Sequence, residues 1–287
     1  MRLSRAETDF VAQGVAQDVR EDGRGRGSFR GADVATGVVP QANGSARVSL
    51  GSSTAATIVL AAVKAEIGTP DASAPETGRL EGQVQLSPVM FADERASRTD
   101  ATALSAVELT RLLARQLGAV GSERRVVLGI VGGRFCWVLH VDVLVLSDGG
   151  GNVVDAMSLA VAAALGDTIL PLLRATEGDG DVGDYEIEHD APPVRLHSAL
   201  ADACPISVTM RQLGSNFVVD ASKTEEVCSG ARFTAMVSRK GAVCGLHSSG
   251  GDGLEPRAIF AMLQSAHMGA AALFRAIDAE RRERDRV

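Results

Sequence analysis

The chain has 287 residues, enough for one large domain or two smaller ones with a substantial hydrophobic core. Its net charge of −7 and its aromatic content of 3% argue against a protein that binds nucleic acid by itself, because such proteins usually carry a basic surface or exposed rings for base stacking. Four scattered cysteines without a CxxC motif and five histidines without metal-ligand spacing predict buried small side chains rather than a metal site.

Targeting and membrane signals are not apparent in the sequence. Residues 1–30 are polar and mixed in charge, which predicts no signal peptide, and no apolar run reaches membrane-spanning length. We therefore expect a reducing, intracellular setting.

The first part of the chain predicts a helix followed by strands. Ser4 and Glu7 form a capping-box pattern, followed by an apolar stripe at Phe10, Val11, Val15 and Val19. A polar, glycine-rich turn comes next. Four β-type segments between Gly, Ser and Pro clusters then predict an antiparallel meander, at residues 33–39, 46–50, 58–66 and 80–86.

The middle of the chain predicts two helices around a pair of strands. Residues 102–117 form a helix with a buried leucine stripe, and Arg111 and Arg115 share another of its faces. Continuous apolar character predicts buried strands at 124–131 and 135–146. A glycine-rich turn leads into an alanine-rich helix at 153–165, which must pack closely on the sheet. Residues 176–191 predict an acidic surface loop.

The last part repeats this plan in smaller form. Four strands are predicted at 206–213, 216–219, 231–238 and 242–247. Pro256 then opens a helix whose apolar residues recur at spacings of three and four. Residues 280–287 predict a charged, frayed end. Strands followed by a helix, twice over, predict an α+β fold of two related lobes.

An acidic cluster near residue 220 is the strongest chemical signal. Asp220, Glu225 and Glu226 follow an apolar strand, and Arg232 closes the segment. Carboxylates gathered at a turn could hold a divalent cation or transfer a proton. Arginine at the far end would place a fixed positive charge in such a site, because guanidinium does not deprotonate.

Several segments in the same order resemble the RNase PH superfamily, in particular its exosome-ring members. They are Asp22-Gly23-Arg24, Gly44-Ser45-Ala46-Arg47-Val48, Val63-Lys64-Ala65-Glu66, the stretch 137–165, and Val218-Val219-Asp220 with Glu225-Glu226. The stretches WVLHVDVL, GNVVDAMSLAVAAAL and VVDASKTEEVCSGA are most similar to the non-catalytic partner lineage. Inserted residues at 52–57 depart from the family's first hairpin.

This resemblance implies an RNase PH-like fold with an N-terminal helix and basic turn at 1–30, a first lobe at 31–190 and a second lobe at 191–287. It also implies a degenerate catalytic site. Of the family's two key aspartates, the first falls at Glu226 and the second at Arg232, and no arginine follows the glycines of the turn at 150–154. We expect no metal and no cofactor, with Glu225 and Glu226 on a solvated turn and Arg232 paired to Glu226.

The resemblance further implies a heterodimer with another RNase PH-like subunit, joined edge to edge within a hexameric ring. Cap subunits, attached nucleases and RNA are the other expected partners, without a membrane, in the nucleus, nucleolus and cytoplasm. Arg111 and Arg115 fall where related subunits place RNA-binding arginines; the alternative is a solvated helix face with Glu108 paired to Arg111. Arg24, Arg26 and Arg30 suggest a surface or interface element.

Two other functions stay open at this point. One is an active phosphate-dependent 3′–5′ exoribonuclease, which Arg232 and the cation-free turn disfavour. The other is an unrelated α+β metabolic enzyme, for which the sequence offers no pairing of a nucleophile with a base.

Overall fold

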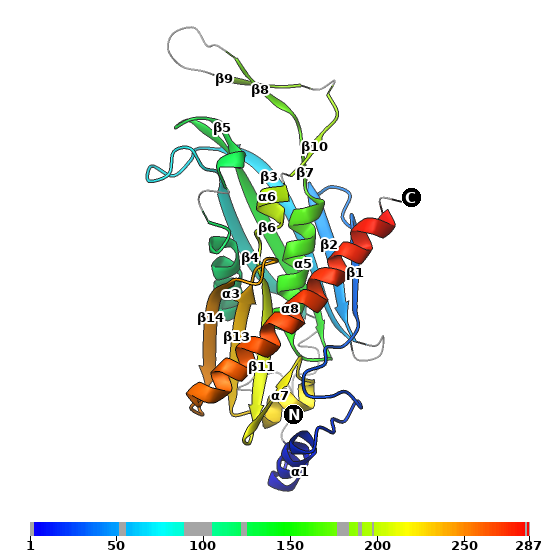
Figure 1. Cartoon of the computed structure of the whole chain (residues 1–287). Coiled ribbons are helices and arrows are strands. Elements are labelled where there is room, and N and C mark those ends of the chain that lie inside the picture. The colour runs from blue at the N-terminus through cyan, green and yellow to red at the C-terminus, as the bar shows by residue number, and fades with distance from the viewer. Residues whose placement is uncertain are drawn as a thin grey trace.

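The structure of the chain is a computed structural model, which describes residues 3–51, 56–88, 105–121, 125–176, 184–188, 191–196, 198–284 and 286. Two β-sheets with helices packed on them form the body, and one long helix crosses both sheets (Figure 1). One large cluster of buried apolar residues runs through both sheets and the helices between them. The predicted α+β fold is confirmed.

The first sheet has the strand order β1-β2-β3-β6-β4, with β5 paired to β6. Its strands are β1 (Ala32–Thr36), β2 (Gly44–Leu50), β3 (Thr57–Gly68), β4 (Arg79–Leu86), β5 (Gly129–Val131) and β6 (Phe135–Asp148). The predicted meander is correct for β1, β2 and β3, which are antiparallel neighbours. It is wrong for β4, which pairs with β6 in parallel. The reason is the helix α3 (Ala106–Gly118), which lies between the two strands in the chain and allows a crossover connection.

Helix α5 (Val153–Asp167) fills the space between the two sheets. Nearly all its residues are buried, and it packs on β1, β2, β3 and β6 on one side and on β11 on the other. Its close approach to the first sheet depends on Gly44, where a Cβ atom would lie 2.6 Å from the carbonyl oxygen of Ala164. The predicted close packing is confirmed. The leucine stripe of α3 is buried as expected, and residues 102–104 of that prediction lie outside the described part.

The second sheet has the order β12-β11-β13-β14, and all its neighbours are antiparallel. Its strands are β11 (Ile206–Leu213), β12 (Asn216–Val219), β13 (Ala231–Val237) and β14 (Val243–Gly250). The predicted strands agree with these bounds to within three residues. A short helix, α7 (Lys223–Cys228), stands between β12 and β13, where a turn was expected.

Two predictions in the middle of the chain differ from the structure. The strand expected at 124–131 is present only at its end, as β5, after a 3-10 turn, η2 (Val126–Leu128), and residue 124 lies outside the described part. The loop expected at 176–191 contains β9 (Asp184–Ile187), which pairs with β8 (Leu173–Thr176) in a hairpin that projects from the body (Figure 1). Residues 177–183 and 189–190 of the expected loop lie outside the described part of the chain. The strand sequences LRAT and DYEI are too short for an alternation of apolar residues to identify them. Short pieces complete the chain there: β7 (Ile169–Leu170), β10 (Val194–Arg195) and α6 (Ser198–Ala201).

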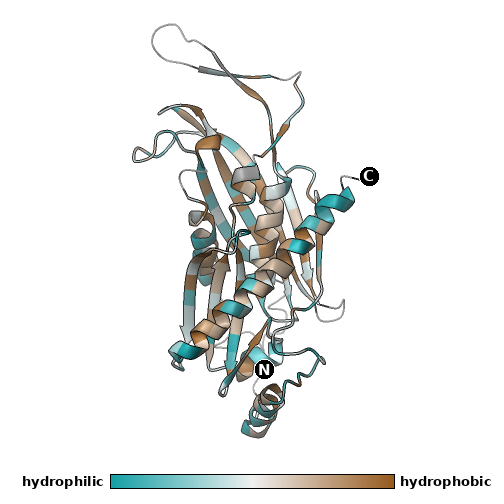
Figure 2. Cartoon of the chain, in the orientation of Figure 1, coloured by the Kyte–Doolittle hydropathy of each residue, from teal (hydrophilic) through white to brown (hydrophobic). Residues whose placement is uncertain are grey.

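Helix α8 (Pro256–Arg284) covers part of the second sheet and reaches β1 of the first. It becomes hydrophilic toward its C-terminal end (Figure 2). This end is not frayed as predicted, because Glu280 accepts hydrogen bonds from Thr36, and Arg284 forms an ion pair with Asp167 at the end of α5. These hydrogen bonds and this ion pair join α8 to β1 and to the end of α5.

The N-terminal helix α1 (Arg5–Ala16) has the predicted capping box. Its apolar stripe is only partly buried: Val15 packs beside Leu213 and Val218, whereas Phe10 is 78% exposed. Cys136 and Cys204 are buried as predicted, but Cys244 is exposed. In the described part of the chain, no helix combines the length and the apolar character needed to cross a membrane.

Candidate functional site

The acidic cluster predicted at 220–226 lies where β12 leads into α7. Ser222 caps this helix, and Glu225 completes a capping box by accepting the Ser222 N–H at 2.7 Å. The same carboxylate accepts two hydrogen bonds from Arg20, at 2.6 and 2.8 Å, and both side chains are buried. Glu225 is therefore a structural residue, and the prediction that it lies on a solvated turn is wrong.

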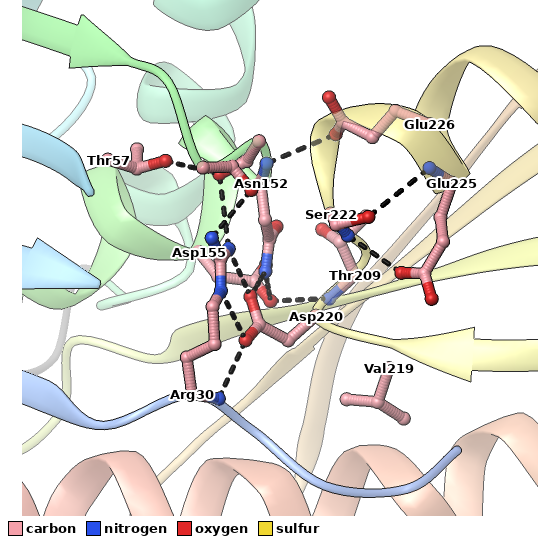
Figure 3. Close-up of polar contacts among 12 residues, drawn as sticks. Arg30, Thr57, Asn152, Asp155, Thr209, Val219, Asp220, Ser222, Glu225 and Glu226 are labelled. Carbon is pink, nitrogen blue, oxygen red and sulfur yellow. Dashed lines mark hydrogen bonds and ion pairs between the residues drawn. The ribbon is translucent and has the colours of Figure 1, made fainter. Parts of the chain in front are cut away.

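Asp220 is buried, with Arg30 beside it (Figure 3). Arg30 donates to it from its guanidinium at 2.8 and 2.9 Å and from its backbone N–H at 2.8 Å, and Arg24 donates at 2.9 Å. Burial alone would raise the pKa of Asp220, but the hydrogen bonds and charge of Arg30, with a bond from Asn152, outweigh burial and lower it. Asp220 is thus held as a carboxylate.

These contacts correct the prediction for the basic segment near the N-terminus. Arg24 and Arg30 have side chains only 13% and 11% exposed, and both bind Asp220. Arg26 remains partly exposed, beside Asp18. Arg24 and Arg30 therefore attach the N-terminal segment to the second lobe and do not form a surface element.

The glycine-rich turn before α5 is also occupied. The carbonyl oxygens of Gly150 and Gly151 accept hydrogen bonds from Arg30, at 2.5 and 3.2 Å. The next residue, Asn152, adopts a left-handed conformation with φ of 56°, and its backbone N–H points to Glu226 at 3.1 Å (Figure 3). The turn has no cation in its own sequence, and Arg30 of the N-terminal segment supplies one. Arg30 is, however, already bound to Asp220.

Asp155 lies beneath this turn, fully buried in a mostly apolar helix. One of its oxygens accepts the Thr209 N–H and the Asn152 side-chain amide, both at 2.9 Å. Burial raises the pKa of Asp155 to about 7, although these hydrogen bonds oppose the shift. The sequence analysis did not single out this residue; its signal is one acid within the apolar run VVDAMSLAVAAAL.

The two positions expected to be degenerate do not pair with each other. Glu226 binds Arg211 of β11 at 3.0 Å, and Arg232 of β13 binds Glu108 of α3 at 2.5 Å. The predicted ion pair between Arg232 and Glu226 is wrong because Arg211, opposite Arg232 in the sheet, takes the carboxylate of the adjacent α7.

The predicted RNA-binding arginines lie on the exposed surface of α3. Arg115 contacts the Nδ1 atom of His247 on β14 at 3.2 Å, and Arg111 has no ion pair with any residue that the structure describes. Glu108 is not paired with Arg111, as one alternative held, since it binds Arg232. At helical spacing the two arginines share a face with Glu108, so the fold brings Arg111 and Arg115 to the same side as Arg232, which binds Glu108.

Carboxylates at this site are therefore engaged by arginines rather than left free for a metal. Across the described residues, no group of three or more His, Cys, Asp or Glu side chains could hold a metal ion. Sequence reasoning missed Arg20 and Arg211, and it named Glu108 with a different partner. A weak signal exists for Arg211, which is a charged residue within the otherwise buried strand ISVTMRQL.

Comparison with known proteins gives a consistent result. The sequence models of the two domains of the RNase PH or 3′ exoribonuclease family match residues 28–171 and 203–269. An RRP42 protein of Dictyostelium discoideum is 29% identical, covering 96% of this chain and 97% of that protein. The exosome complex component Rrp42 of Methanopyrus kandleri is 32% identical, covering 84% of each chain.

Solved structures agree with these relatives. A chain of the Archaeoglobus fulgidus exosome, solved with RNA bound to the active site, superposes with a TM-score of 0.74 at 26% identity. The match covers 94% of this chain and 97% of the other. In its sequence over most of its length and in its fold, the chain belongs to the RNase PH family of 3′ exoribonucleases.

Proposed function

We propose that this chain is a non-catalytic, RNA-guiding subunit of a hexameric exosome core ring and takes part in 3′–5′ RNA processing and degradation. Relatives named as Rrp42 components of the exosome complex and the likeness to archaeal exosome chains support the ring. The limits of the two lobes, 31–190 and 191–287, are part of this proposal.

The pairing of the carboxylates with arginines carries the non-catalytic part of the proposal. Phosphorolysis needs cations that hold a phosphate ion, and a carboxylate that binds a divalent metal or protonates the leaving oxygen. Arginines engage Asp220, Glu225 and Glu226, and an arginine stands at the position of the second acid, Arg232. Asp155 has a suitable pKa, but it is fully buried beneath the turn and has no access to a substrate.

The open edge of the second sheet supports assembly with a partner subunit. Strand β14 is an edge strand whose Val243 and Leu246 are 40% and 50% exposed. Such an edge invites pairing with another chain. We propose that an RNase PH-like subunit forms a heterodimer there, and that cap subunits and nucleases attach to the resulting ring, in the nucleus, nucleolus and cytoplasm.

Arg111 and Arg115 are the proposed contacts to RNA. Both are exposed, and their shared face can approach successive phosphates of one strand. In a chain of net charge −7, a local group of arginines can attract the RNA backbone where the rest of the surface does not.

Reconstitution tests the proposal directly. The chain is assembled with its RNase PH-type partner, and RNA decay is measured with and without inorganic phosphate for the wild type and for Glu226→Gln. We expect unchanged decay, because Glu226 is bound to Arg211 and takes no part in chemistry. Phosphate-dependent decay that Glu226→Gln abolishes would instead favour the alternative of an active exoribonuclease. The control variant Glu186→Gln makes the same chemical change on the projecting hairpin, away from this site, and should also leave decay unchanged.

A further inference from the structure

Two arginines of the second sheet lie side by side in the protein interior. Arg211 of β11 and Arg232 of β13 are direct partners in the strand register, and they are only 6% and 4% exposed. In both, the Nε atom is buried and has no hydrogen-bond partner among the described residues. A buried donor without a partner is costly, so this pair retains unused capacity to bind an anion.

Positive charge is in excess around this pair. Arg115 approaches from α3 through its contact with His247, so three arginines face only two carboxylates, Glu108 and Glu226, which are bound to the pair. Burial and the neighbouring charge of Arg211 lower the pKa of Arg232. Burial, Arg232 and Arg115 lower the pKa of His247 in turn. Burial is the larger cause in both groups, and the neighbouring arginines act in the same direction because like charges repel. An anion bound beside these arginines would relieve that repulsion.

The two carboxylates are held very differently. Glu226 has a side chain 17% exposed, and it also accepts the Asn152 N–H, so it is fixed from two sides. Glu108 is 38% exposed, and Arg232 is the one charged partner of its carboxylate among the described residues. Glu108 therefore covers a buried guanidinium from the solvent side, where an external anion would bind.

We propose that Arg232 and Arg211, assisted by Arg115, form a binding site for a single phosphate group, and that Glu108 occupies this site as an internal counterion when no ligand is bound. Arginine suits such a ligand because its planar guanidinium binds phosphate oxygens through two parallel hydrogen bonds. The phosphate group belongs either to the inorganic ion or to the backbone of RNA. The site deepens the proposed function only in the RNA case.

Inorganic phosphate is the first probe. Its affinity for the full chain is measured by calorimetry at constant ionic strength, with chloride as the reference anion. Glu108→Gln removes the competing carboxylate, and we expect it to bind phosphate about tenfold more tightly. Arg232→Gln should lose binding. Arg239→Gln is the matched control, because Arg239 is also paired with carboxylates, Asp202 and Asp278, but on another part of the surface; it should bind like the wild type.

Equal or weaker phosphate binding by Glu108→Gln would overturn the proposal, as would undiminished binding by a folded Arg232→Gln. If Arg232→Gln does not fold, the result for Glu108→Gln decides alone. A short single-stranded RNA that competes with phosphate identifies the backbone as a ligand, and phosphate binding without competition identifies the free ion. These measurements use the chain without its ring partners. A chain that binds phosphate but fails to assemble would therefore contradict the proposed function without contradicting the proposed phosphate site.

Discussion

Replacing the buried acid beneath the glycine-rich turn, Asp155→Asn, should change how stability depends on pH. Asparagine keeps an oxygen for the Thr209 N–H and the Asn152 amide but carries no charge. In the folded chain the pKa of Asp155 is raised from 3.8 to about 7. Between these values the folded state therefore holds a proton that the unfolded state has lost.

The sign of the effect follows from this difference. The additional proton on Asp155 contributes to the free energy of unfolding. This contribution is fully present below about pH 4 and is lost as the pH rises through about 7. A shift of this size changes the wild-type free energy of unfolding by about 2–3 kcal/mol between pH 5 and pH 8. The variant has no such term. Its stability relative to the wild type should therefore be higher at pH 8 than at pH 5 by that amount.

Urea denaturation followed by circular dichroism, at pH 5 and pH 8 and equal ionic strength, measures this difference. Asp142→Asn is the matched control, because Asp142 is exposed on β6 and bonded only to Gln83 among the described residues. Its stability relative to the wild type should be the same at both pH values. If the stability of Asp155→Asn relative to the wild type is also the same at pH 5 and pH 8, Asp155 is ionised at both pH values. That result would refute the reasoning from its burial.

Three further changes probe the packing and the charges. Asp220→Asn should lower the free energy of unfolding at pH 7 by about 3–5 kcal/mol, because it removes the carboxylate that Arg30 binds and one of the two that Arg24 binds; a loss under 1 kcal/mol in urea denaturation would contradict this. Gly44→Ala should cost about 1–3 kcal/mol by forcing β2 away from α5, and an unchanged thermal midpoint would argue against the close contact. Arg111→Gln with Arg115→Gln should weaken RNA binding by the assembled ring and reduce its salt dependence by about one unit per contact; an unchanged salt slope would exclude both as phosphate contacts.

Local patterns predicted most of the secondary structure. The strands of the second lobe and the helices α5 and α8 were evident because each has a long buried face that repeats at the period of a strand or helix. The errors fall where that signal is weak. Strand β4 looks like its antiparallel neighbours, and its parallel pairing with β6 depends on a crossover rather than on its own residues. The hairpin of β8 and β9 projects from the body, and its strands are too short for an alternation of apolar residues to identify them.

The residues of the candidate site were predicted better than their contacts. Asp220, Glu225, Glu226 and Arg232 do meet around β12, α7 and β13, but the expected solvated turn and the expected pair between Arg232 and Glu226 are absent from the described structure. Each carboxylate binds an arginine from another segment instead. Nothing in the local sequence indicates which arginine that is.

By itself, the sequence determined the fold class, the order of the elements and the identity of the charged residues, because burial patterns and residue types are local properties. Tertiary structure decided how those charges combine. Arg20 meets Glu225 across 205 residues, and Arg30 meets Asp220 across 190. An ion pair forms only where two side chains come within about 4 Å, and that distance depends on how the N-terminal segment packs on the second sheet rather than on any repeat along the chain.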